Sequence, residues 1–249
     1  MKLFQRVFFA AVLAGLAAGL VMSAVQQWRV APLILAAEEY EGEAPIAAHT
    51  HEAGTPAHDH GDAHEHEHDE DAWAPQDGAE RIFYTVLANV LGSIGFTMLL
   101  AAVSVLAGIE ITAKNGVIWG LAGFVSLQLA PAFGLPPELP GMPAADLGTR
   151  QAWWVATALT TGAGLLAIAK LRNWTGIVIA AVLILAPHVW GAPAAPHEPS
   201  AVPAHLATAF AASSLFAGAV FWLIAGPLLG WLSERFAQSP AFAVKGAHA

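Results

Sequence analysis

Seven histidines lie between residues 49 and 68, and acidic side chains alternate with several of them. They are His49, His51, His58, His60, His64, His66 and His68. Neutral imidazole binds divalent cobalt, nickel, copper and zinc, and nearby carboxylates attract the cation. The run His64-Glu65-His66-Glu67-His68 places several such groups within reach of one ion. We therefore predict that this segment captures divalent transition metals with low specificity. The alternative is a solvated acidic linker in which the histidines are incidental.

Five more candidate ligands lie near the ends of apolar segments: Glu138, Asp146, His188, His197 and His205. A histidine at membrane depth is costly unless it has a partner. His188 is therefore either a metal or proton ligand, or an interfacial histidine that is bonded to backbone or water. Glu138 and Asp146 offer carboxylates, one of which Arg150 is expected to pair with. His197 and His205 are also compatible with ordinary loop positions.

Uncharged polar residues recur within the apolar segments. Asn89, Ser93 and Thr97 share one helix face at four-residue spacing, and Gln128 lies in the next segment. Such residues either line a polar path or join helices by hydrogen bonds, and the second role is the commoner one in membrane helices.

The composition is typical of a membrane protein. The chain has 249 residues and a mean hydropathy of +0.56, and 12% of its residues are charged, against about 25% in soluble domains. The absence of cysteine excludes disulfides, thiolate metal sites and a cysteine nucleophile. The net charge of −9 argues against nucleic acid as a partner.

Six apolar segments are long enough to be considered as membrane-spanning helices, which need roughly 20 apolar residues. They are residues 7–25, 82–109, 116–133, 152–169, 175–190 and 206–232. We predict an all-α membrane protein with about six transmembrane helices, or five if the first segment is a cleaved signal peptide. Met22 is too large for a good cleavage site in Met22-Ser23-Ala24. The short connection at residues 170–174 predicts a tight helical hairpin.

The positive residues predict the orientation, because cytoplasmic loops carry the excess of lysine and arginine. A cytoplasmic N-terminus places seven on the inside and three on the outside. The inside set is Lys2, Arg6, Lys114, Lys170, Arg172, Arg235 and Lys245, and the outside set is Arg29, Arg81 and Arg150. Both termini are then cytoplasmic in a multi-pass protein of the bacterial inner membrane.

This topology predicts four parts. Residues 1–36 form the first transmembrane helix and its exit, and residues 37–81 form a periplasmic loop. Residues 82–235 form a five-helix bundle, and residues 236–249 a cytoplasmic tail. Apolar periodicity is lacking in the histidine-rich loop, so we expect it to be disordered.

Small residues recur at every fourth position in three of the apolar segments. The sets are Ala11, Gly15, Gly19 and Ser23; Gly116 and Gly120; and Gly226 and Gly230. This spacing lines one helix face and predicts close approach of neighbouring backbones.

Several stretches resemble the CbtA family of predicted cobalt transporter subunits. The most specific is Leu135-Pro136-Pro137-Glu138-Leu139-Pro140-Gly141, which continues through Ala144-Ala145-Asp146-Leu147 to Arg150-Gln151-Ala152-Trp153-Trp154. The others are Pro187-His188, Gly191-Ala192-Pro193, Pro203-Ala204-His205-Leu206 and the opening Phe4-Gln5-Arg6. The resemblance covers nearly the whole chain except the histidine-rich loop. It implies cobalt uptake beside a small single-span partner, CbtB.

The residues and the resemblance together favour a permease subunit for a divalent transition metal, with cobalt first and nickel or zinc as alternatives. The second hypothesis is a non-transporting subunit that buffers metal or acts as a scaffold, and a homo-oligomer is compatible with either. The third is a membrane redox enzyme. It is disfavoured because His188 is the only histidine within an apolar segment, whereas membrane haem usually has histidine ligands inside helices. We therefore do not expect an enzyme.

Overall fold

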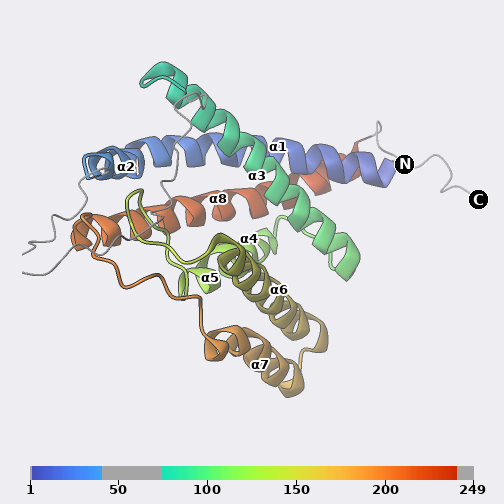
Figure 1. Ribbon diagram of the computed structural model, residues 1–249. Helices are drawn as coiled ribbons and strands as arrows, with labels where there is room; N and C mark the ends of the chain where they lie inside the picture. The colour runs from blue at the N-terminus through green and yellow to red at the C-terminus, as the bar shows by residue number, and fades with distance from the viewer. Residues whose placement is uncertain (1, 41–74, 240–249) are drawn as a thin grey trace, which may run out of the picture.

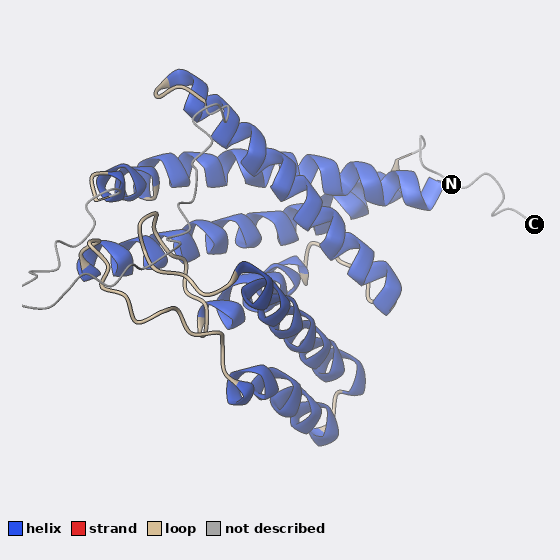
Figure 2. Cartoon of the chain, viewed as in Figure 1, coloured by secondary structure: helices blue, strands red, loops and turns tan. Residues whose placement is uncertain are grey.

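The computed structural model describes residues 2–40 and 75–239, and within these ranges the chain forms helices and loops without a β-strand (Figure 2). The helices are α1 (Lys2–Arg29), α2 (Ala31–Glu38), α3 (Ala79–Ala107), α4 (Gly116–Phe124), α5 (Ala130–Ala132), α6 (Leu147–Leu171), α7 (Trp174–Trp190) and α8 (Ala204–Gln238). A π-helical turn, η1 (Val125–Leu129), joins α4 to α5 without a break.

All six predicted apolar segments are helical. Four helices, α1, α3, α6 and α8, are long and apolar enough to cross a membrane. The continuous helix Gly116–Ala132 and α7 are apolar but shorter. The prediction of an all-helical protein with membrane-spanning segments is therefore confirmed, with four spans that meet the length requirement.

The predicted loop at residues 37–81 is helical at both of its ends. α2 continues to Glu38, and α3 begins at Ala79. The difference arises because Ala37 is fully buried against α8 and the loop at residue 139, so tertiary contact extends the helix beyond the apolar run. Residues 41–74, with all seven loop histidines, lie outside the described residues.

Two groups of helices make up the structure. α1 packs against both α3 and α8, and α8 also packs against α4 (Figure 1). α6 and α7 form a hairpin, and α6 contacts η1 and α5. The start of α1 and the end of α8 lie at one end of the bundle, whereas α2 and the loops before α6 and α8 lie at the other (Figure 1).

The α6–α7 hairpin is as tight as predicted. Arg172 ends α6 in the left-handed region with a φ of 51°. Asn173 then caps α7, because its side-chain oxygen accepts a hydrogen bond from the Gly176 backbone N–H at 3.0 Å. Two residues therefore reverse the chain.

The small-residue faces bring neighbouring backbones into close contact, as predicted. A Cβ atom added to Gly116 would lie 2.6 Å from the Gly226 carbonyl oxygen, and one on Gly226 would lie 2.7 Å from the Gly120 nitrogen. In α1, a Cβ atom on Gly15 would lie 2.6 Å from the Ile94 Cα in α3. Glycine is therefore required where α4 meets α8 and where α1 meets α3, because the backbones themselves are in contact.

Candidate functional site

A cavity of about 630 Å³ lies beneath the loop before α6. Its walls come from loop residues 135–138, from α6, from η1 and α5, and from Ser214 and Leu215 of α8. We call it the outer cavity, because the topology predicted from the sequence places this loop outside. Much of the stretch 135–154 that carried the family resemblance therefore surrounds one hollow space.

The charged residues of the outer cavity form an ion pair. Arg150 Nη2 donates a hydrogen bond to Glu138 Oε2 at 2.7 Å, and both side chains are largely shielded from solvent. Arg150 therefore pairs with Glu138 rather than with Asp146. Glu138 lines the outer cavity, but its negative charge is balanced by the guanidinium.

A second and smaller cavity of about 160 Å³ lies among α1, α3, η1 and α8. Asn89 and Ser93 of α3, Gln128 of η1 and Trp222 of α8 are among its lining residues. We call it the inner cavity. Leu127 and Gln128 line both cavities, so η1 separates them.

The polar face of α3 joins two helices and also lines a cavity. The Asn89 amide donates hydrogen bonds to Gln26 Oε1 and to Ser23 Oγ of α1, the latter at 3.3 Å, and so joins the two helices. Thr97 is fully buried and donates to the Ser93 carbonyl of its own helix at 2.7 Å. Asn89 and Ser93 also face the inner cavity, so hydrogen bonding between helices and a polar lining occur on the same face.

His188 contacts the backbone of the neighbouring helix. Its Nε2 lies 3.1 Å from the Ala130 carbonyl oxygen. A carbonyl can only accept, so Nε2 carries the proton and Nδ1 holds the free lone pair. Nδ1 is buried and has no hydrogen-bond partner in the described part of the chain. Trp153 and Phe133 lie against the ring, with centroids 5.8 and 6.3 Å away. One ring nitrogen of His188 therefore makes the backbone hydrogen bond expected of an interfacial histidine. The other nitrogen, Nδ1, remains available as a ligand.

The other three candidate ligands occupy exposed positions. Asp146 caps α6, where its Oδ1 accepts a hydrogen bond from the Thr149 N–H at 2.9 Å. His197 lies in the exposed loop before α8, and His205 lies in the first turn of α8. Across residues 2–40 and 75–239, no three His, Asp or Glu side chains come together in a way that could hold a metal ion. The described residues therefore hold no complete set of metal ligands. Metal capture by the histidine-rich segment remains a prediction.

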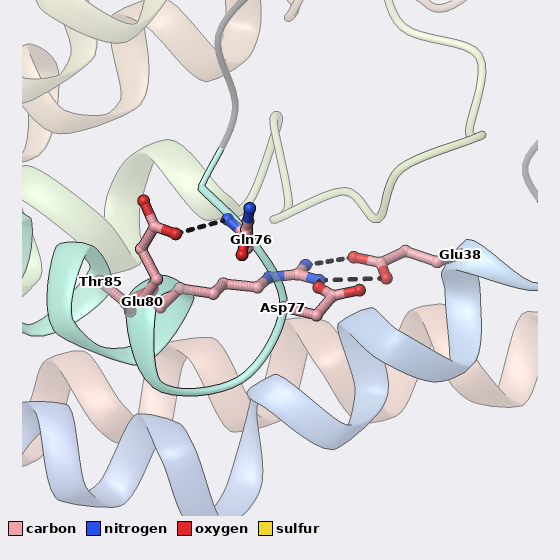
Figure 3. A network of polar contacts seen from close by, with 6 residues as sticks. Glu38, Gln76, Asp77, Glu80 and Thr85 are labelled. Carbon is pink, nitrogen blue, oxygen red and sulfur yellow. Dashed lines mark hydrogen bonds and ion pairs between the residues drawn. The ribbon is translucent and has the colours of Figure 1, made fainter.

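An ion-pair network joins the two helices that flank the histidine-rich segment. Arg81 of α3 donates hydrogen bonds from both Nη atoms to the Glu38 carboxylate at the end of α2. Figure 3 shows this carboxylate with Asp77 close by. Arg81 Nη1 also lies 3.1 Å from Asp77 Oδ1. The network therefore brings positions 38 and 81 together.

We expect Arg81→Gln to have a small effect on stability. About a third of each side chain of the Arg81–Glu38 pair is exposed, and such pairs contribute about 1 kcal/mol or less. Thermal unfolding in mild detergent should show a decrease in Tm of about 4 °C at most. Arg29→Gln is the matched control, because Arg29 is exposed and its guanidinium lies over the Trp28 ring, 5.4 Å from its centroid. A large decrease in Tm for Arg81→Gln, without one for Arg29→Gln, would contradict this prediction.

Comparison with known protein families shows which family the chain belongs to. The family model described as "Probable cobalt transporter subunit (CbtA)" matches residues 4–234. The chain belongs to the CbtA family. The resemblance noted in the sequence is thereby confirmed, and the matched range contains both cavities and His188. No curated protein and no solved structure matches the chain significantly.

Membership of the CbtA family makes the chain a membrane protein of a cobalt transport family, and its description as a subunit implies a partner. The sequence indicated Gln128 only as an uncharged polar residue within an apolar segment and did not indicate Ser214 at all, although both line cavities. The available signal was a glutamine inside an apolar segment shortly before a proline. Its significance depends on helices that are distant in the sequence.

Proposed function

We propose that this CbtA-family chain is a permease subunit that carries divalent cobalt inward across the bacterial inner membrane. The observation that supports this most strongly is the outer cavity, whose walls include Glu138, Arg150 and the neighbouring residues of the family-like stretch. In this proposal the cavity is the entrance through which the ion reaches the interior of the bundle. A pathway, rather than a catalytic centre, is what this arrangement supports.

The proposed topology has six spans, with both termini in the cytoplasm. α7 and the continuous helix Gly116–Ala132 are the demanding cases. The 17 residues of α7 extend only about 25 Å, against a hydrocarbon thickness of about 30 Å. Trp174 and Trp190 stand at its two ends and are largely exposed. Tryptophan is favoured at both membrane interfaces, and the bilayer thins locally around short spans. The excess of inside lysine and arginine supports the orientation.

The membrane potential is a sufficient source of energy for uptake. It contributes about 2.3 kcal/mol per charge per 100 mV, hence about 4.6 kcal/mol for a divalent cation. That free energy corresponds to accumulation of about 2,000-fold. The sequence lacks a G-x-x-x-x-G-K-[ST] phosphate loop, so ATP hydrolysis by that motif is not part of the proposal.

The histidine-rich segment is proposed to concentrate metal at the outer surface, with selectivity residing in the bundle. Deleting residues 49–68 should raise the cobalt concentration needed for half-maximal uptake and leave the preference for cobalt over nickel and zinc unchanged. A matched variant keeps the length of the segment and replaces the seven histidines by glutamine. It distinguishes the effect of losing the imidazole groups from the effect of shortening the segment. A changed metal preference in either variant would show that the segment selects the ion.

Uptake of radiolabelled cobalt into proteoliposomes tests the main proposal. The vesicles contain this chain alone, with an imposed inside-negative potential and with nickel and zinc as competitors. Saturable uptake supports a permease. Uptake that requires a small single-span CbtB-like protein supports a two-subunit pathway. If there is no uptake either with or without that protein, a metal-buffering scaffold is favoured. A Soret band in the absorption spectrum of the purified protein would instead point to a haem enzyme.

A further inference from the structure

The two cavities meet at one polar side chain. Leu127 and Gln128 are the residues that line both of them, and Gln128 is the polar member of this pair. An ion that moves between the two cavities past η1 would meet this side chain. Gln128 is therefore the polar group to consider at the boundary between the two cavities.

The backbone at Gln128 has an unusual hydrogen-bond register. The Ala130 N–H bonds to the Val125 carbonyl, five residues back, so η1 carries one residue more per turn than an α-helix. Pro131 follows and cannot donate to the Leu127 carbonyl as an α-helical residue would. π-helical turns of this kind are frequent at functional sites. Here the turn places Gln128 against α8 between the two cavities.

The neighbouring helix leaves room for this side chain. Gly218 of α8 is buried, and a Cβ atom on it would collide with the Gln128 carboxamide, including its Oε1 and Nε2 atoms. The carboxamide therefore occupies the space that any larger residue at position 218 would fill. Gly218 thus makes the position of Gln128 possible.

Three polar atoms around the inner cavity lack a protein partner. Gln128 Oε1, Ser93 Oγ and Trp222 Nε1 are all buried, and none has a hydrogen bond to another described residue. A buried polar atom without a partner is costly, and native structures usually supply water or an ion. A volume of about 160 Å³ is sufficient for several water molecules. These atoms indicate a hydrated chamber.

We propose that Gln128 is the neutral oxygen ligand at a constriction through which a hydrated divalent cation passes from the outer to the inner cavity. This inference rests on the proposed permease function. A carbonyl oxygen can replace one water of a divalent cation without adding a formal charge. Binding is then favourable enough for entry and weak enough for release, as conduction requires. Ser93 Oγ offers a second oxygen on the inner side.

Cysteine accessibility tests the constriction without relying on cobalt transport. The natural chain has no cysteine, so single cysteines can be introduced directly. Ser93→Cys marks the inner cavity and Gln151→Cys the outer cavity. Leu159→Cys marks the outside of α6, where the side chain is 68% exposed. A membrane-impermeant cationic methanethiosulfonate is added to the outer face of spheroplasts that express each variant.

We expect Gln151→Cys to react fastest and Ser93→Cys to react more slowly, with Leu159→Cys unreactive because lipid surrounds it. Adding Gln128→Leu should slow the Ser93→Cys reaction by about tenfold or more, because an apolar residue at a constriction disfavours hydrated cations. Gly218→Ala should also slow it, because its methyl group displaces the flexible end of Gln128. Millimolar cobalt should slow the reaction of Ser93→Cys.

Cobalt uptake by variants at the same position completes the test. Gln128→Leu should lower cobalt uptake by about tenfold, whereas Gln76→Leu, at an exposed position on the loop before α3, should not. The constriction is ruled out if Ser93→Cys is as unreactive as Leu159→Cys, or if Gln128→Leu changes neither labelling nor uptake. A third outcome is that labelling of Ser93→Cys depends on Gln128 but the natural chain takes up no cobalt. That result would support the cation constriction and reject the permease function.

Discussion

Gly226→Leu is expected to prevent correct assembly of the helical bundle. A Cβ atom at this position would lie 2.7 Å from the Gly120 nitrogen and 2.9 Å from the Gly120 Cα, and would collide with the Gly116 carbonyl oxygen. All three are backbone atoms, so no side chain can move aside. Overpacking a core commonly costs about 1–3 kcal/mol. Separating two backbones should cost at least that, and leucine should abolish the α4–α8 contact.

Size-exclusion chromatography and thermal unfolding in mild detergent measure the effect. We expect aggregated or low-yield protein for Gly226→Leu and a markedly lower Tm for Gly226→Ala. Gly95→Leu is the matched control, because a Cβ atom there would meet open space within helix α3. Leucine is also a better helix former than glycine by about 0.8 kcal/mol. Equal profiles for Gly226→Leu and Gly95→Leu would show that α4 and α8 do not pack as described.

Glu138→Gln and Arg150→Gln are expected to change cobalt uptake in opposite directions. The first leaves an unpaired positive charge in the outer cavity, and the second leaves an unpaired negative charge. At a separation of about 8 Å, one charge acts on a divalent cation with about 1 kcal/mol in water and about 4 kcal/mol at an effective dielectric constant of about 20. We therefore expect the KM for cobalt to rise about tenfold in Glu138→Gln and to fall several-fold in Arg150→Gln.

Initial uptake rates in proteoliposomes, measured over a range of cobalt concentrations, separate KM from the maximal rate. Glu198→Gln and Arg29→Gln are matched controls, because both residues are exposed and lie on the proposed outer side. Raising the ionic strength should reduce the controls' effects more than those of the partly shielded pair. Shifts of KM in the same direction for both cavity variants would mean that the ion pair acts by holding the loop to α6 rather than by its charge.

The structure gives the polar residues of the helices more than one role. Asn89 was expected to join helices, and it does bond to Ser23 and Gln26. It nonetheless lines the inner cavity beside Ser93 and Gln128. A pattern on one helix indicates a polar face, but the residues opposite that face decide whether it is packed or hollow.

The sequence by itself determined the helical class, the six apolar segments, the small-residue faces and the family resemblance, because length, apolarity and four-residue spacing are local properties. It also indicated that Arg150 would neutralise one of two nearby carboxylates. Only the tertiary structure decided that Glu138 is the partner, that Gly116 and Gly120 meet Gly226, and that Gln128 stands between two cavities. These outcomes depend on the relative register of helices as far apart in the sequence as α1 and α8. That register is set by packing of whole helix faces in three dimensions, which no single segment specifies.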